Sequence, residues 1–151
     1  MVYNFKMTKK NIVLFKLLLV LIFSLSVIQL QADDIIVTKK SVIDTKNSLE
    51  WQDNSESKEN IWKMAVGSCK QLDIENHHDW RLPTQKELIA LSKRAALKEK
   101  FRYLEANVCW SSDPDKDEEL NAITVFTGNG FKSSSDKCDK NFIICVRDYQ
   151  K

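Results

Sequence analysis

The four cysteines are the most reactive side chains in this sequence, and their number favours structural disulfides over catalysis. They are Cys69, Cys109, Cys138 and Cys145. In an exported chain, an even number of cysteines predicts two disulfides, for which three pairings are possible. Zinc is the alternative, but no Cys-x-x-Cys pair occurs and the two histidines are adjacent, so the spacing of zinc ligands is absent. We therefore expect no metal site and no cofactor.

Two other clusters invite chemistry, and for both we expect solvated turns or loops. The adjacent His77 and His78 suggest a metal or an acid–base pair, but neighbouring side chains in a turn point in different directions. Acidic residues are dense between positions 113 and 119 and could attract calcium. They lack the ordered ligand positions and the glycine of an EF-hand loop.

A basic stretch is the candidate ligand surface, and two aromatic residues, Phe101 and Tyr103, are interleaved with it. Its cations are Lys93, Arg94, Lys98, Lys100 and Arg102. On a helix, Arg94 and Lys98 would share a face, because they are four residues apart. The stretch is interpreted either as a solvated helical face or as a docking patch for a polyanion.

Residues 79–84 are predicted to form a buried junction that starts a helix. Pro83 is excluded from a helix interior and extends the residue before it. Thr84 and Glu87 then have the spacing of a capping box. Arg81 can form a fork with carbonyl groups or with a carboxylate. Since no nucleophile lies next to a base here, we expect these residues to have a structural role and none of them to be catalytic.

The hydrophobic pattern predicts an α+β domain, with two helices packed on small antiparallel sheets. The expected helices cover residues 62–72 and a segment beginning after Thr84. The expected strands are residues 35–37, 42–44, 49–52, 108–110, 122–126, 131–132 and 142–146. The last of these is nearly all apolar and is expected to be central. The residues expected to hold this framework together are Trp51, Trp62, Asp79, Trp80, Arg81, Pro83, Thr84, Glu87 and Trp110.

Residues 1–32 are predicted to be a signal peptide. Four lysines precede an apolar run from Leu17 to Leu30, and the small residue Ala32 lies at the predicted cleavage site. The run is short for a membrane span, although an uncleaved N-terminal anchor is the alternative. Residues 33–151 would then form one periplasmic, secreted or cell-surface domain without a membrane span. Removing the four lysines changes the formal net charge from +2 to −2, which argues against nucleic-acid binding.

Several motifs occur in an order that is typical of a known family. They are Leu49-x-Trp51-Gln52-Asp53, Trp62-x-x-Ala65, Asp79-Trp80-Arg81-Leu82-Pro83-Thr84, Trp110-Ser111-Ser112 and Cys145-Val146-Arg147. Together they resemble the bacterial Lcl C-terminal domain family over essentially the whole of residues 33–151. The resemblance implies a C-type-lectin-like fold. The cysteine pairing of C-type lectins, carried over, implies the disulfides Cys69–Cys145 and Cys109–Cys138. The loop with which lectins bind calcium and sugar is absent.

The same resemblance implies an exported, non-enzymatic binding module with an adhesion-type role. Its expected ligand is a surface polysaccharide or a sulfated glycan. A periplasmic protein-partner or inhibitor module, working with an envelope protein, is the alternative. The family is also distantly similar to formylglycine-generating enzymes, which need two reactive cysteines, whereas the cysteines here are better used as structural bridges.

Overall fold

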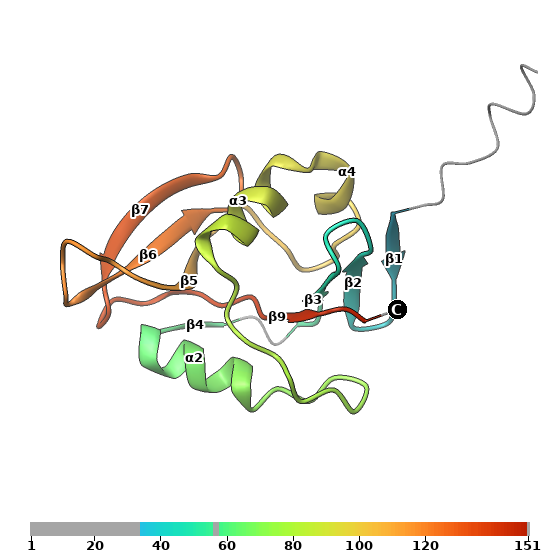
Figure 1. The fold of residues 1–151 in the computed structure, drawn as a ribbon, viewed down its shortest axis with the longest axis horizontal. Coiled ribbons are helices and arrows are strands. Elements are labelled where there is room, and N and C mark those ends of the chain that lie inside the picture. Colours follow the sequence, from blue (N-terminus) through green and yellow to red (C-terminus); the bar gives the residue numbers. More distant parts are fainter. Residues whose placement is uncertain (1–33, 56–57, 151) are drawn as a thin grey trace, which may run out of the picture. The chain divides into compact units, whose positions relative to one another are not determined.

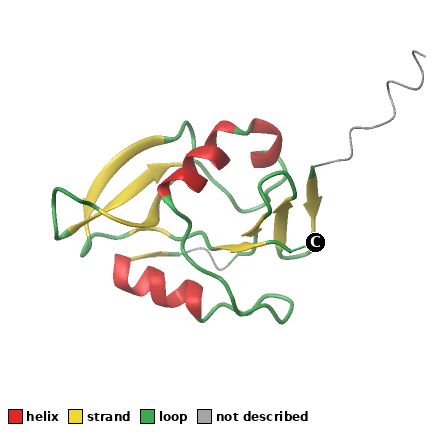
Figure 2. Cartoon of the chain, in the orientation of Figure 1, coloured by secondary structure: helices red, strands yellow, loops and turns green. Residues whose placement is uncertain are grey.

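Two small sheets and three short helices make up the part of the chain that the structure describes (Figures 1 and 2). The structure is a computed structural model, and it describes residues 34–55 and 58–150. The predicted signal peptide lies outside these residues. The arrangement is α+β, as the hydrophobic pattern predicts, and strands outnumber helices.

The first sheet joins the beginning of the described chain to its end. Its strands β1 (Ile35–Val37), β2 (Ser41–Asp44), β3 (Leu49–Gln52) and β9 (Val146–Asp148) lie in the order β1-β2-β3-β9. All neighbouring pairs are antiparallel. The predicted hairpin between β2 and β3 is confirmed, with Val42 opposite Trp51. Ser48 adopts a positive φ of 54° in its turn.

The second sheet has the order β4-β8-β5-β6-β7. Its strands are β4 (Glu59–Asn60), β5 (Val108–Pro114), β6 (Asn121–Phe126), β7 (Phe131–Asp136) and β8 (Asn141–Phe142). The prediction of one continuous strand over residues 142–146 is wrong, because this segment divides between β8 in the second sheet and β9 in the first. The residues between them cross from one sheet to the other, where the Cys145 carbonyl accepts a hydrogen bond from the Gln52 amide at 2.9 Å.

The helices are α2 (Trp62–Lys70), α3 (Gln85–Lys93) and α4 (Ala95–Lys98). The capping box predicted at the start of α3 is present. The basic stretch does not continue as one helix, since Arg94 has φ −99° and ψ 84° and separates α3 from α4. Within the described ranges, each helix is too short or too polar to cross a bilayer.

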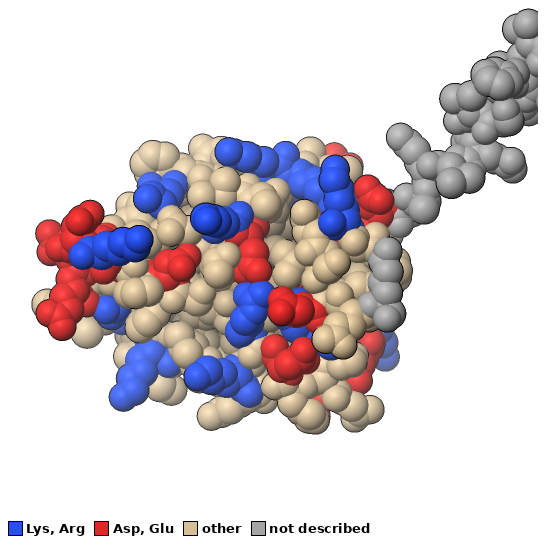
Figure 3. Space-filling model, in the orientation of Figure 1, with Lys and Arg blue, Asp and Glu red and all other residues tan. Residues whose placement is uncertain are grey.

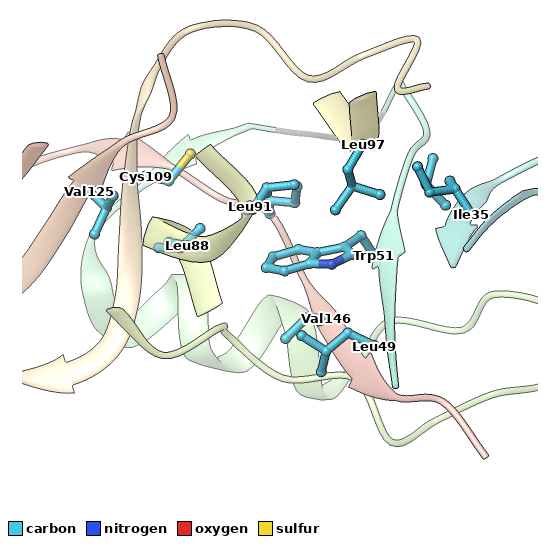
Figure 4. Close-up of a cluster of buried hydrophobic side chains, with 11 residues drawn as sticks. Ile35, Leu49, Trp51, Leu88, Leu91, Leu97, Cys109, Val125 and Val146 are labelled. Carbon is cyan, nitrogen blue, oxygen red and sulfur yellow. The ribbon is translucent and has the colours of Figure 1, made fainter. Parts of the chain in front are cut away.

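The core consists of two clusters, each built around tryptophan. In the first, Trp51 packs between Leu91 and Leu97 on one side and Leu49 and Val146 on the other (Figure 4). The second cluster contains Trp80 and Trp110, which are 2% and 0% exposed, together with apolar residues of α2. Trp62 is half-buried, and its indole N–H donates to the Ser111 carbonyl at 2.8 Å.

Cys69 of α2 and Cys145 form a disulfide with a Cα–Cα distance of 5.5 Å. This pairing is the one that the family resemblance implies. The second implied disulfide is wrong, because Cys109 is a buried free thiol and Cys138 an exposed one.

The strand register explains why these two thiols stay apart. Cys109 lies opposite Val125 of β6, whereas Cys138 follows Asp136, which lies opposite Asn121 of the same strand. The four steps along the strand from Val125 to Asn121 span about 13 Å at roughly 3.3 Å each. A disulfide needs Cα atoms within about 7 Å.

We predict that thiol labelling without reductant modifies one cysteine in the native protein and two in denaturant. Cys138→Ser should remove the native signal without loss of stability, because that side chain is exposed. Cys69→Ser/Cys145→Ser should lower the free energy of unfolding by about 4 kcal/mol, given the 76-residue separation. A denatured protein without reactive thiols would contradict this cysteine assignment.

Candidate functional site

Arg81 ties the junction before α3 to both the helix and the last strand. Its amide N–H donates to the Val146 carbonyl, and its carbonyl accepts from the Val146 amide, both at 2.9 Å. Its guanidinium forms a fork with the Glu87 carboxylate at 3.0 and 2.9 Å and donates to Asp148 at 2.8 Å. The hydrogen bond to Glu87 is the largest influence that raises the Arg81 pKa, so the side chain stays charged.

Glu87 also closes the cap of α3. Its carboxylate accepts from the Thr84 amide at 2.7 Å, and the Thr84 hydroxyl accepts from the Glu87 amide at 3.3 Å. Burial favours the neutral carboxyl, but the bonds from Arg81 and Thr84 outweigh it and hold the Glu87 pKa below its ordinary value. Asp113 of β5 accepts from the Gln85 amide at 2.6 Å. The start of α3 is therefore fixed from two sides.

A second arginine, Arg147 of β9, is buried in the first sheet. It donates to Glu50 at 2.6 Å and to Asp79 at 2.7 Å, and the Ser41 hydroxyl donates to Glu50 at 2.6 Å. The hydrogen bond from Arg147 lowers the Asp79 pKa. Asp79 and Arg81 thus connect the same junction to opposite sides of β9.

The two arginines of the predicted basic stretch each form an ion pair with a buried carboxylate, although the Arg102 side chain is 45% exposed. Arg94 forms an ion pair with Asp44, which is 1% exposed, and a second one with Asp34. The Asp53 carboxylate, which is fully buried, accepts from the Arg102 side chain at 3.1 Å. These two arginines neutralise buried carboxylates, so their charge is not free for a ligand.

The lysines of the stretch differ in accessibility. Lys98 donates to the Gly128 carbonyl at 3.0 Å. Lys93 and Lys100 are exposed, and neither side chain has a hydrogen bond or ion pair to another residue in the ranges 34–55 and 58–150. Of the five predicted ligand residues, these two keep a free charge.

Sequence reasoning missed Lys86, an exposed lysine of α3 whose charge is also free among the described residues. Lys86, Ala90 and Lys93 are exposed at positions four and three residues apart along α3, so they share one helical face. Figure 3 shows blue side chains over α3 and α4, others over α2, and a group of red ones over the loop between β5 and β6. The sequence signal that could have identified Lys86 is the seven-residue spacing of Lys86 and Lys93, which is two helical turns. We give the name lysine face to the exposed Lys86 and Lys93, which share one face of α3, together with the exposed Lys100 just after α4.

The remaining clusters have structural partners. Asp115 of the acidic loop accepts from Ser134 and from the Asp117 amide, and the bond from Ser134 is the main cause that lowers its pKa. The His78 Nδ1 atom lies 3.9 Å from the Asp73 Oδ1 atom. The backbone of His77 forms an isolated antiparallel bridge with that of Ile74. The described residues contain no group of three side chains suited to hold a metal.

Comparison with known proteins identifies one similarity. A model of the Lcl C-terminal domain family matches residues 40–147, a range that contains the junction, the second sheet, the strands β2 and β3 of the first sheet, and the lysine face. A search among curated proteins found no matching sequence.

We predict that Glu87→Gln makes the stability of the fold less dependent on pH in the acidic range. Because its folded-state pKa lies below the ordinary 4.5, ionised Glu87 stabilises the fold above that pH, and this stabilisation is lost as pH falls through the folded pKa. The wild-type melting temperature should be steady above about pH 5 and fall below it. Glu87→Gln should melt lower at pH 7 and show a shallower acid slope. Exposed Glu99→Gln is the control, and an equally shallow slope there would refute the assignment.

We predict that Arg94→Ala acts through stability. It leaves buried Asp44 with only the hydrogen bonds from Asn47, and breaking a buried ion pair costs about 3 kcal/mol. The neighbouring exposed Lys93→Ala should change the free energy of unfolding by less than about 0.5 kcal/mol. Urea unfolding measures both, and equal values for the two variants would contradict a structural role for Arg94.

Proposed function

The chain belongs to the Lcl C-terminal domain family, and we propose that it is an exported, non-enzymatic binding module for an anionic surface polysaccharide such as a sulfated glycan. In this proposal residues 1–32 direct export, and residues 33–151 form a C-type-lectin-like domain in the periplasm or at the cell surface. The role is of the adhesion type.

The lysine face is the observation that carries the proposal. Lys86, Lys93 and Lys100 are exposed cations that form no ion pair with any residue of the described ranges, and they lie on α3 or just after α4. The domain without its first 32 residues has a formal net charge of −2. Attraction to a polyanion therefore has to come from a local group of cations, and flexible lysines suit sulfates that are spaced along a chain.

The state of the cysteines supports a role without catalysis. Cys69 and Cys145 are joined in a disulfide. Burial raises the pKa of Cys109 to about 12, which keeps this thiol protonated at neutral pH, whereas a nucleophilic cysteine reacts as the thiolate. An enzyme of the formylglycine-generating type would need two reactive cysteines.

An envelope protein partner is the second candidate, and a pocket beside the junction favours it. This pocket has a volume of about 220 Å³ and is lined by Val66, Lys70, Arg81, Leu82, Thr84 and Ser112. Its lining combines apolar residues with the exposed Lys70, so it suits an apolar side chain next to a carboxylate. Such binding would depend less on salt than polyanion binding does.

We predict that the protein is retained on heparin at low salt and that Lys86→Glu/Lys93→Glu elutes at lower salt. Reversing two exposed charges should weaken binding at least about tenfold, since each exposed pair contributes roughly 0.5 kcal/mol and reversal adds repulsion. Retention should fall with ionic strength, because the Debye length is about 8 Å at physiological salt.

Lys63→Glu/Lys70→Glu is a matched control for this experiment. These exposed lysines have the same seven-residue spacing on α2, which also has nine residues, and the change in net charge is identical. If both double variants elute alike, net charge alone governs retention and the lysine face is not a site. A wild-type protein that is not retained at low salt would refute the polyanion proposal itself.

A further inference from the structure

A cleft opens between the end of β3, the segment before β5, and β8. It has a volume of about 220 Å³ and is lined by Asn54, Ser55, Tyr103, Glu105, Asn107 and Phe142. A narrower extension of about 20 Å³ shares four of these residues and reaches Cys109, Ile143 and Ile144. We call the larger space the Tyr103 cleft. Drug-sized ligands occupy about 300–1,000 Å³, so this cleft suits a smaller group.

The wall that carries Tyr103 is held rigidly by a buried carboxylate. Asp53 accepts from the amides of Arg102 at 3.0 Å and of Tyr103 at 2.9 Å. The Arg102 guanidinium, which is itself bound to Asp53, lies 5.8 Å from the centre of the Tyr103 ring. Arg102 therefore helps to position the aromatic ring of Tyr103.

The far end of the same segment is fixed by Thr127. The Thr127 hydroxyl donates to the Glu105 carbonyl at 2.8 Å and accepts from the Asn107 amide at 3.0 Å. The Thr127 amide donates to the Asn107 carbonyl at 2.9 Å. With both ends anchored, the cleft is formed before a ligand arrives, which reduces the entropy lost on binding.

Three of the residues that line the cleft carry a polar side-chain group without a hydrogen-bond partner in the described part of the chain. The Tyr103 hydroxyl, the Glu105 carboxylate and the Asn107 side-chain amide make no hydrogen bond within the described ranges, and Tyr103 is 47% exposed. Together they offer both donors and acceptors. Phe142 and the Tyr103 ring add apolar faces to the same space. A few oriented polar groups on an aromatic lining are typical of a small-molecule site.

We propose that the Tyr103 cleft binds one uncharged hexopyranose ring. The apolar C–H face of such a ring can pack on the aromatic side chains, while its hydroxyls bond to the amide and the carboxylate. Glu105 disfavours sulfated or carboxylated sugars, because like charges repel most strongly where water is displaced. This inference goes beyond the polyanion site and does not depend on it, since the lysine face and the cleft use different residues.

Amide NMR shifts of the full-length ¹⁵N-labelled protein, titrated with the methyl glycosides of glucose, galactose, mannose and N-acetylglucosamine, test the proposal. We expect at least one to shift the amides of Tyr103, Glu105 and Asn107. A dissociation constant on the order of 1 mM follows from the usual ligand efficiency over about 12 atoms. It should be the same at low and physiological salt, because the sugar is uncharged.

Two variants separate the cleft from general surface binding. Tyr103→Ala should weaken binding at least tenfold. Phe131→Ala, which removes an aromatic residue 68% exposed on β7, should leave it unchanged. Absence of shifts with all four glycosides up to about 50 mM, or equal losses in both variants, would overturn the proposal.

The methyl glycoside of glucuronic acid, which we call the glucuronic acid probe, is the charged counterpart of the glucose probe. It should bind more weakly than any neutral glycoside that binds, and Glu105→Gln should reduce this difference. Tighter binding of the glucuronic acid probe in this cleft would also overturn the proposal. Because heparin retention measures the lysine face separately, either proposal can fail while the other stands.

Discussion

The fold depends on neutralising carboxylates that it buries. The chain has four arginines, and each pairs with a carboxylate: Arg81 with Glu87, Arg94 with Asp44, Arg102 with Asp53, and Arg147 with Glu50. Asp44, Glu50 and Asp53 are at most 3% exposed. A buried charge without a partner costs several kcal/mol. These ion pairs therefore fix the positions of the loops and helices relative to the first sheet. They act in addition to the packing of apolar side chains.

This constraint divides the cations of the chain between two tasks. Arginine has a planar, always charged fork that matches a carboxylate, whereas lysine carries a compact and strongly hydrated charge. None of the lysines in the described ranges is buried. On α3 and just after α4, the exposed cations that form no ion pair within the described residues are therefore lysines, even where arginines stand beside them in the sequence. Arg102 likewise pairs with Asp53 and packs against the Tyr103 ring. The polar groups proposed to bind a ligand in the Tyr103 cleft belong to Tyr103, Glu105 and Asn107.

The closing segment shows how a single short stretch serves both sheets. Phe142 of β8 lies opposite Cys109 in the second sheet, and Val146 of β9 lies opposite Trp51 in the first. Between them Cys145 is bonded to α2 through the disulfide. Within five residues the segment contacts the second sheet, helix α2 and the first sheet. It is therefore apolar throughout, although it does not form one strand.

The sequence by itself determined the local structure: the hairpin of β2 and β3, the capping box of Thr84 and Glu87, and the buried tryptophans. These features depend on residues a few positions apart, whose spacing is visible in the chain. The tertiary structure decided the rest. Arg94 meets Asp44 across 50 residues, Arg102 meets Asp53 across 49, and Arg147 meets Glu50 across 97, and no local pattern encodes such partners. Strand register likewise kept Cys109 from Cys138, because pairing in a sheet is set by contacts between distant segments.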